Sequence, residues 1–216
     1  MTFDSIPKFV INLPSREDRL EDIAKEFEKH GIDFTVWPAV DGKHLKINPN
    51  SKKANEYNAK GILGCMKSHY NLIQHAKINR YKYIAVFEDD ILLSVDFEER
   101  VNYLLSEDFD VAYLGGQFDR LGRDLIPADR KYIFKVCQVG GTYAYIIRNT
   151  VYDYILKNMN YNWGVDQFYA DRVQKEFNCI AFYPFGVLHL DGMSDVAMHD
   201  AKYANIKKHC QLKRIL

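Results

Sequence analysis

Short apolar runs alternate with amphipathic stretches along most of the chain. The runs with the length of strands cover residues 8–13, 33–40, 81–87, 110–116, 132–137, 142–147 and 179–185. Between them, apolar residues recur at intervals of three and four, which predicts helices near residues 15–30, 63–76, 96–105, 150–159 and 165–177. This alternation is typical of an α/β sheet. The runs 132–137 and 142–147 flank two glycines and have the pattern of antiparallel strands.

Residues 41–60 interrupt this pattern. The segment is rich in Lys and Asn, contains Pro49 and shows no periodicity. A stretch of this length without regular structure is uncommon in a compact domain, and it predicts a functional or mobile loop. The chain has no internal repeat, and its 216 residues suit a single domain, 1–216.

The composition is that of a soluble globular protein, with 47% hydrophobic and 27% charged residues. Lys plus Arg and Asp plus Glu both number 29, and this balance argues against general attraction to nucleic acid or an acidic membrane. No run has the length of a transmembrane segment, and the N-terminus has no apolar signal region. We therefore expect a cytoplasmic protein, free or peripheral to a membrane, or a catalytic domain excised from a larger chain. The sequence does not predict an oligomeric state.

The cysteines stand far apart, at positions 65, 137, 179 and 210. No C-x-x-C pair occurs, which argues against a zinc site and against a disulfide-framed scaffold. Cys65, Ser68 and His69 fall on one predicted helix, where a nucleophile beside a histidine is conceivable. Adjacent residues on a helix do not face each other, however. These residues are better interpreted as a small, partly polar helix face that packs on the sheet.

An acidic triplet, Glu88-Asp89-Asp90, ends the clearest buried strand in the sequence. Side chains alternate along a strand, so Glu88 and Asp90 are expected on one face and Asp89 on the other. Paired carboxylates at the carboxyl end of a sheet strand suit Mg²⁺ or Mn²⁺, and open α/β sheets bind ligands there. The alternative is a solvated acidic turn.

Two further residues could complete such a site. His189 follows the last predicted strand and could add a nitrogen ligand to two carboxylates. Asp166 opens a predicted helix, where it is either a first-turn acid favoured by the helix dipole or a general base. No G-x-x-x-x-G-K or G-x-G-x-x-G loop is present, which argues against kinases, ATPases and dinucleotide-binding enzymes.

Several segments together resemble glycosyltransferase family 25, which includes lipooligosaccharide and collagen galactosyltransferases. They are FVINLPSREDRL, WPAVDGK, GILGCMKSH, YIAVFEDD, DVAYLGG and VDQFY, and they lie in order between Lys8 and Gly192. The resemblance implies a GT-A-type α/β fold with a mostly parallel sheet. It places the nucleotide-sugar part at about 1–116 and the acceptor side at about 117–216. The chain is short for this family, which leaves the acceptor open.

The resemblance also implies UDP-galactose or a similar UDP-sugar, a Mn²⁺-like ion (or Mg²⁺), inversion at the anomeric carbon, and a glycan or hydroxylysine-type acceptor, as in lipopolysaccharide biosynthesis. The donor would contact Asn12, Leu13, Arg16, Asp41, Ser68, Glu88 and Asp89. Asp90, Glu88 and His189 would bind the metal, with Asp90 the main ligand. Glu88 is longer than the Asp of a D-x-D motif and could contact ribose instead. Asp166 would be the base that takes the acceptor's proton.

Two alternatives remain open at this point. A metal-dependent phosphohydrolase acting on nucleotide sugars would use the same carboxylates, although such enzymes usually carry a cluster of histidines that this chain lacks. A non-catalytic module that binds a sugar nucleotide or a glycan could descend from a transferase. The presence of Glu88, Asp90 and Asp166 argues weakly against loss of catalysis.

Overall fold

The computed structural model describes residues 1–47, 59–118, 125–127, 132–160, 164–190, 192–193 and 200–201. Much of the segment predicted as a functional loop, residues 48–58, lies outside this part of the chain. The rest of that segment contains a short 3-10 helix and the first two residues of a long helix. Among the described residues, no helix combines the length and apolar character needed to cross a membrane.

One sheet of eight strands forms the centre of the molecule, in the order β2-β1-β3-β10-β5-β11-β8-β7. These strands are β1 (Lys8–Asn12), β2 (Thr35–Pro38), β3 (Tyr83–Glu88), β5 (Val111–Tyr113), β7 (Leu125–Pro127), β8 (Ile133–Val136), β10 (Ala144–Arg148) and β11 (Cys179–Phe182). β1 pairs in parallel with β2 and β3, and β5 pairs in parallel with β11. β10 lies antiparallel between β3 and β5. The predicted α/β class is confirmed.

Small two-stranded sheets complete the strands. They are β4 (Ile91–Leu93) with β12 (Val187–His189), β6 (Gln117–Phe118) with β9 (Val139–Gly140), and β13 (Gly192–Met193) with β14 (Asp200–Ala201). The strands predicted at 132–137 and 142–147 both exist, but they do not form a hairpin with each other. β8 pairs with β11 and β7, whereas β10 pairs with β3 and β5. Their alternating pattern indicated strands correctly but contained no information about the partner of each strand.

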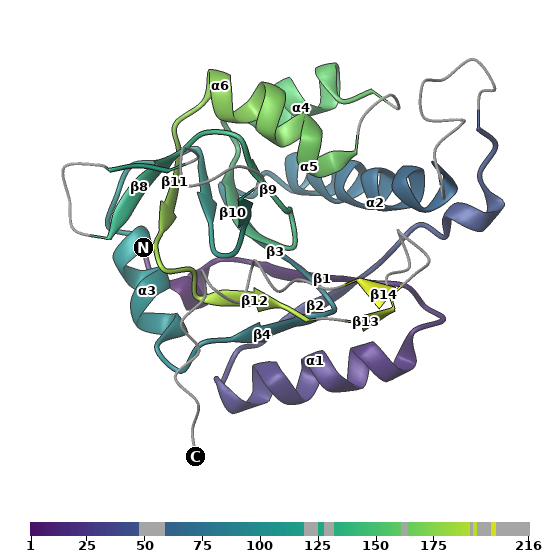
Figure 1. Cartoon of the computed structure of the whole chain (residues 1–216), viewed down its shortest axis with the longest axis horizontal. Coiled ribbons are helices and arrows are strands. Elements are labelled where there is room, and N and C mark those ends of the chain that lie inside the picture. Colours follow the sequence, from purple (N-terminus) through teal and green to yellow (C-terminus); the bar gives the residue numbers. More distant parts are fainter. Residues whose placement is uncertain are drawn as a thin grey trace.

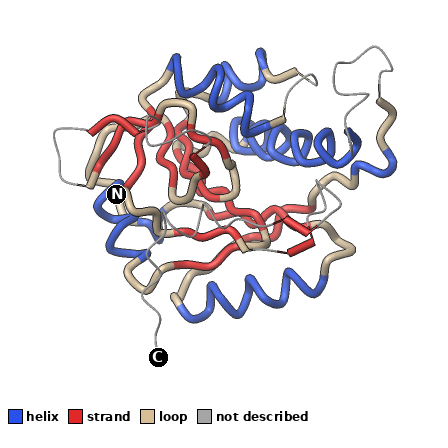
Figure 2. The backbone as a smooth tube through the Cα atoms, in the orientation of Figure 1, coloured by secondary structure: helices blue, strands red, loops and turns tan. Residues whose placement is uncertain are grey.

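Helices cover both faces of the sheet (Figures 1 and 2). They are α1 (Glu17–Lys29), α2 (Ala59–Ile78), α3 (Phe97–Leu104), α4 (Tyr152–Asn158), α5 (Val165–Phe168) and α6 (Gln174–Glu176), with η1 (Phe3–Ser5), η2 (Gly42–His44) and the π-helical turn η3 (Tyr169–Val173). In Figure 1, α1 lies on one side of the sheet and α2, α4, α5 and α6 lie on the other. α2 begins at Ala59, before the predicted Leu63.

Two buried clusters hold these layers together, one on each face of the sheet. α1 contributes Ile23 and Phe27 to the first cluster, together with residues of α3. α2 contributes Leu72 and Ile73 to the second, together with residues of α4 and α5. Successive strand residues alternate between the clusters, since Val10 belongs to the first and its neighbours to the second. Burial of both faces explains why the strands read as continuous apolar runs.

A short antiparallel pair of strands brings His189 next to the end of β3. In β4 and β12, His189 lies opposite Ile91, and the backbone N–H of Leu190 donates to the carbonyl oxygen of Asp90 at 2.8 Å. α1 holds β4 in place, because the buried carboxylate of Glu26 accepts the backbone N–H of Leu93 at 2.9 Å. His189 is thereby fixed next to the acidic end of β3.

Gly64 allows α2 to approach the segment that follows β2. A Cβ atom at Gly64 would lie 2.6 Å from the carbonyl oxygen of Val40 and 2.9 Å from the backbone nitrogen of Gly42. Both are backbone atoms, so the clash cannot be relieved by rotating a side chain. We expect Gly64→Ala to lower the free energy of unfolding by about 1–3 kcal/mol, although Ala is favoured over Gly by about 1 kcal/mol inside a helix.

Urea unfolding would measure this effect, with Asn71→Ala on the exposed face of the same helix as the control. The control is expected to be neutral or slightly stabilising because Ala has the higher helix propensity. An increase in stability for Gly64→Ala would contradict the close approach of α2 to residues 40–42.

Candidate functional site

Five of the predicted site residues gather at the carboxyl ends of three adjacent parallel strands. β1 ends at Asn12, β2 is followed closely by Asp41, and β3 ends in Glu88, with Asp89 and Asp90 directly after it. These strands are neighbours in the sheet, so residues distant in sequence reach one edge. Ligands of open α/β sheets bind at such an edge.

Asp89 is held from two sides. Its Oδ2 accepts a hydrogen bond from Asn12 Nδ2 at 2.7 Å, and its Oδ1 lies 2.9 Å from Arg19 Nη1. Asn12 Nδ2 also donates to the carbonyl oxygen of Arg16 at 3.0 Å, which ties the end of β1 to the start of α1. Asn12 is buried, so in this conformation it positions the acidic turn.

Glu88, Asp90 and His189 form a compact group of potential metal ligands. One ligand atom from each lies within 4.8 Å of the others. Asp90 Oδ1 is buried without a hydrogen bond and lies 3.2 Å from His189 Nε2. Neighbouring ligands of an octahedral divalent ion with bonds of about 2.1 Å lie about 3 Å apart. Two carboxylates and one imidazole therefore fit an ion of the Mn²⁺ type in both spacing and chemistry.

The histidine of this group is oriented for metal binding. His189 Nδ1 lies 3.0 Å from the carbonyl oxygen of Leu190. A carbonyl oxygen only accepts, so Nδ1 carries the proton, and the neutral ring has its lone pair on Nε2, which faces Asp90. The ring also packs edge-on against Tyr143, with centroids 5.0 Å apart. The local backbone thus presents the nitrogen that a metal would use.

The two carboxylates of the group have opposite pKa shifts. Burial raises the pKa of Asp90 to about 6, although the neighbouring His189 opposes this effect. Burial also raises the pKa of Glu88, but the close imidazole of His69, with His189 and Arg19, outweighs it and brings the pKa below its usual value. Without a metal, Glu88 is therefore charged at neutral pH, and Asp90 gains a proton in mildly acidic solution.

These shifts predict a pH dependence of metal affinity. Asp90 must be deprotonated to bind a cation, so affinity for Mn²⁺ is expected to fall as the pH decreases through about 6. Competition with one proton lowers the affinity about tenfold per pH unit once the pH is well below that value. Calorimetric titration with Mn²⁺ between about pH 5 and 8 would measure it. An affinity that does not change across this range would contradict the assignment of Asp90 as a ligand.

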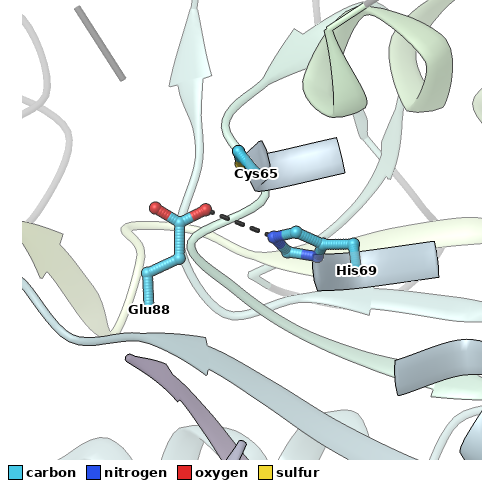
Figure 3. A group of neighbouring side chains, drawn as sticks. All are labelled: Cys65, His69 and Glu88. Carbon is cyan, nitrogen blue, oxygen red and sulfur yellow. Dashed lines mark ion pairs between the residues drawn. The ribbon is translucent and has the colours of Figure 1, made fainter. Parts of the chain in front are cut away.

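Glu88 also contacts a second group of residues, on α2. His69 Nε2 lies 3.5 Å from Glu88 Oε1, and Cys65 stands one helical turn before His69 (Figure 3). His69 is fully buried, and its Nδ1 lies 3.0 Å from the hydroxyl oxygen of Tyr145, which in turn accepts from Tyr169 at 3.3 Å. Glu88 therefore connects the group of Glu88, Asp90 and His189 to a buried chain of polar side chains between α2 and η3.

Asp166 lies on the Cys65 side of the site. It occupies the first turn of α5 with an exposed side chain, and its Oδ1 accepts the backbone N–H of Gln167 at 2.8 Å. Its charge acts on the thiol of Cys65 together with the charges of Glu88 and Asp90. Asp166 is thus exposed and close enough to Cys65 for its charge to act on the thiol.

The other residues predicted to contact the donor differ in how far they are exposed to solvent. Leu13 and Arg16 are partly exposed after β1, and Arg16 Nη2 pairs with Asp18 at 2.9 Å. Asp41 begins η2 and accepts the backbone N–H of Lys43 at 2.9 Å. Ser68 is fully buried, and its hydroxyl donates to the carbonyl of Gly64 and accepts from Val40 N–H, both at 2.8 Å. Its geometry is structural, since it anchors the segment that carries Asp41, and its contact with a donor stays a prediction.

Two residues of the site, Arg19 and His69, were not predicted from the sequence. Arg19 Nη1 lies 2.7 Å from Asp90 Oδ2 and also pairs with Asp89, so it offsets the charge of the acidic turn. In the sequence, Arg19 was recognisable as a basic residue in the first turn of the helix that follows β1. His69 was interpreted as packing, because neither periodicity nor spacing places α2 against the end of β3.

The chain is similar in sequence to known proteins. The model of glycosyltransferase family 25 (LPS biosynthesis protein) matches residues 5–171. The chain is 33% identical over 135 residues to procollagen galactosyltransferase 1-A of Xenopus laevis, which covers 53% of this chain and 21% of that protein. It is 29% identical over 133 residues, or 53% of the chain, to a Bos taurus protein named probable inactive glycosyltransferase 25 family member 3. The chain spans about a fifth of the length of these relatives.

A solved structure gives the corresponding result for the fold. The inositol-1-phosphate CTP transferase from T. maritima superposes with a TM-score of 0.53 at 10% sequence identity, covering 90% of this chain and 93% of that one. At this identity the likeness concerns the fold alone. Together with the order of the sheet, it confirms the expected GT-A-type α/β architecture.

Proposed function

The chain belongs to glycosyltransferase family 25, and we propose that it transfers a hexose, galactose in the first instance, from a UDP-sugar to an acceptor hydroxyl. We propose further that the reaction needs a divalent cation such as Mn²⁺ and inverts the anomeric carbon. The observation that carries this proposal is the convergence of Glu88, Asp90 and His189 at the carboxyl ends of the parallel strands. The relatives named as galactosyltransferases support galactose as the first sugar to test.

Asp90, Glu88 and His189 are the residues that would hold the cation. When bound, it supplies positive charge that stabilises the diphosphate as a leaving group. Arg19 and Arg16 stand in or next to the first turn of α1 and can add positive charge beside the same diphosphate. The N-terminus of α1 favours an anion in the same way through the helix dipole.

Asp166 would complete the reaction on the acceptor side. Its exposed carboxylate can accept the proton of an acceptor hydroxyl as the oxygen attacks the anomeric carbon. Attack opposite the departing diphosphate inverts that carbon and needs one base, the role that we assign to Asp166. The two carboxylates differ in exposure, since the Asp90 side chain is 16% exposed and Asp166 is open to solvent.

A UDP-release assay over a panel of UDP-sugars tests the proposal directly. The enzyme is assayed with Mn²⁺, with EDTA, and with EDTA followed by excess Mn²⁺. We expect UDP release from one preferred donor, lost with EDTA and restored by Mn²⁺, and increased when a glycan or a hydroxylysine peptide is added. Failure of a folded protein to release UDP from any donor would overturn the proposal.

The Bos taurus relative named probable inactive supports one alternative, a module that binds a sugar nucleotide or a glycan without turning it over. Calorimetric binding of UDP in the absence of any turnover would favour that module. A nucleotide-sugar hydrolase would instead release UDP and free sugar at a rate that no acceptor increases. The same assay with product analysis therefore separates the three functions.

A further inference from the structure

A second group of side chains that could bind a metal ion lies beside the group of Glu88, Asp90 and His189. Cys65, His69 and Glu88 each offer a ligand atom, and these atoms lie within 4.8 Å of one another. Cys65 and His69 stand four residues apart on α2, so both point from the same helix face toward the end of β3 (Figure 3). Tetrahedral zinc ligands lie about 3.3–3.8 Å apart, and His69 Nε2 is 3.5 Å from Glu88 Oε1.

The surroundings of His69 are a second observation that points to a bound cation. Its side chain is completely buried, and its Nε2 makes no aligned hydrogen bond although it faces the carboxylate of Glu88. The other ring nitrogen is engaged by the hydroxyl of Tyr145. A buried ring nitrogen without an aligned hydrogen bond is costly, and a cation between the imidazole and the carboxylate would satisfy both groups.

The local charge favours a cation and disfavours a nucleophilic cysteine. Burial, and then the negative charges of Glu88, Asp166 and Asp90, raise the pKa of the Cys65 thiol well above its usual value. The thiol is therefore protonated at neutral pH in the metal-free protein and is a poor nucleophile. The same negative field attracts a dication, which would bind the thiolate and release its proton to solvent.

We propose that Cys65, His69 and Glu88 form a site for a zinc-class cation, distinct from the group of Glu88, Asp90 and His189 that suits Mn²⁺. Thiolate, imidazole and carboxylate are the ligands that zinc prefers, whereas carboxylate-rich sites suit Mn²⁺. Three protein ligands leave a fourth position open for water or another ligand. The wide spacing of the cysteines had argued against zinc, but that argument considered only pairs of cysteines.

Glu88 belongs to both groups, so a metal ion bound at the second site would affect the first. Zinc held by Cys65 and His69 takes the charge of Glu88 and repels a second dication at Asp90 and His189. We therefore expect zinc to inhibit the transfer. This part rests on the proposed function, whereas the binding of zinc does not.

Cobalt(II) provides the test of the site itself. Co²⁺ replaces zinc and shows a sulfur-to-cobalt charge-transfer band in the near ultraviolet only when a thiolate binds it. We expect this band in the parent protein, its loss on addition of Zn²⁺, and its absence in Cys65→Ser. The control is Cys137→Ser, which replaces an exposed cysteine and should keep the band. A parent protein without the band, or a band that Cys65→Ser retains, would overturn the proposal.

Competition with a chromophoric chelator would then measure zinc affinity in the parent, Cys65→Ser, Cys65→Ala and His69→Gln. Loss of a ligand is expected to weaken zinc binding by at least about tenfold, and circular dichroism establishes that each variant is folded. The Cys65→Ala variant keeps the test decisive if Cys65→Ser does not fold. Equal zinc affinity in folded variants and parent would place the site elsewhere.

Inhibition is measured separately, as the zinc concentration that halves each variant's own zinc-free rate at fixed Mn²⁺. We expect Cys65→Ser to need at least about tenfold more zinc than the parent and Cys137→Ser to match the parent. Zinc binding without any zinc-sensitive transfer in an active enzyme would overturn the inhibitory role. A protein without transferase activity that still shows the cobalt band would contradict the proposed function and leave the zinc site standing.

Discussion

Asp90→Asn is expected to lower metal-dependent transfer by about 10³-fold or more while the protein stays folded. Asp90 Oδ1 is buried without a hydrogen bond, and it lies 3.2 Å from His189 Nε2. Asn has the same shape as Asp but no charge, so the variant loses the ligand and keeps the packing. Because burial raises the pKa of Asp90 to about 6, its negative charge lowers the stability of the metal-free protein at neutral pH, and Asn removes this cost.

Three measurements establish this result. Initial rates of UDP release give the loss of activity, calorimetry gives the loss of Mn²⁺ affinity, and thermal unfolding in EDTA checks the fold. Asp22→Asn is the matched control, since Asp22 lies on the outer side of α1 with 79% of its side chain exposed. Turnover within about threefold of the parent would rule out Asp90 as a ligand of the catalytic cation.

Asp166→Asn is expected to reduce turnover by about 10²-fold or more and to leave donor affinity unchanged. The carboxylate of Asp166 is exposed and lies in the first turn of α5. The Asn side chain can still accept the backbone N–H of Gln167, so the helix start is preserved. Only the ability to take a proton is lost.

The measurements for Asp166→Asn separate kcat from binding. The kcat for transfer should fall, whereas the Kd for UDP, measured by calorimetry with Mn²⁺, should match the parent. Asp171→Asn, in the π-helical turn that follows α5, is the control and should retain the parent kcat. Weaker UDP binding in Asp166→Asn would make Asp166 a donor-site residue, and an unchanged kcat would exclude it as the base.

Because both groups contain Glu88, zinc should be removed before the requirement for Mn²⁺ is measured. Zinc contamination would reduce the apparent activity of the parent enzyme and obscure a requirement for Mn²⁺. The protein should therefore be treated with a chelator and returned to Mn²⁺ alone before any donor is called inactive. If zinc binds at Cys65 and His69, this treatment raises the measured rate of the parent more than that of Cys65→Ser.

The sequence alone determined the elements and the identity of the main carboxylates. Apolar runs bounded by polar residues correctly predicted β1, β3, β5 and β11, because strands buried on both faces must be apolar throughout. The spacing of apolar residues predicted α1 and α3 within a few residues of their bounds. The resemblance of ordered segments correctly gave the family, since each segment is a local string of residues.

The tertiary structure decided which distant residues meet. β10 lies between β3 and β5, and β12 pairs with β4, so His189 reaches Asp90 across about a hundred residues of sequence. The approach of α2 places His69 and Cys65 against Glu88, while Ser68 turns inward to a structural position. Periodicity records which face of an element is buried and carries no information about its partner, because packing energy depends on contacts that form only when the whole chain folds.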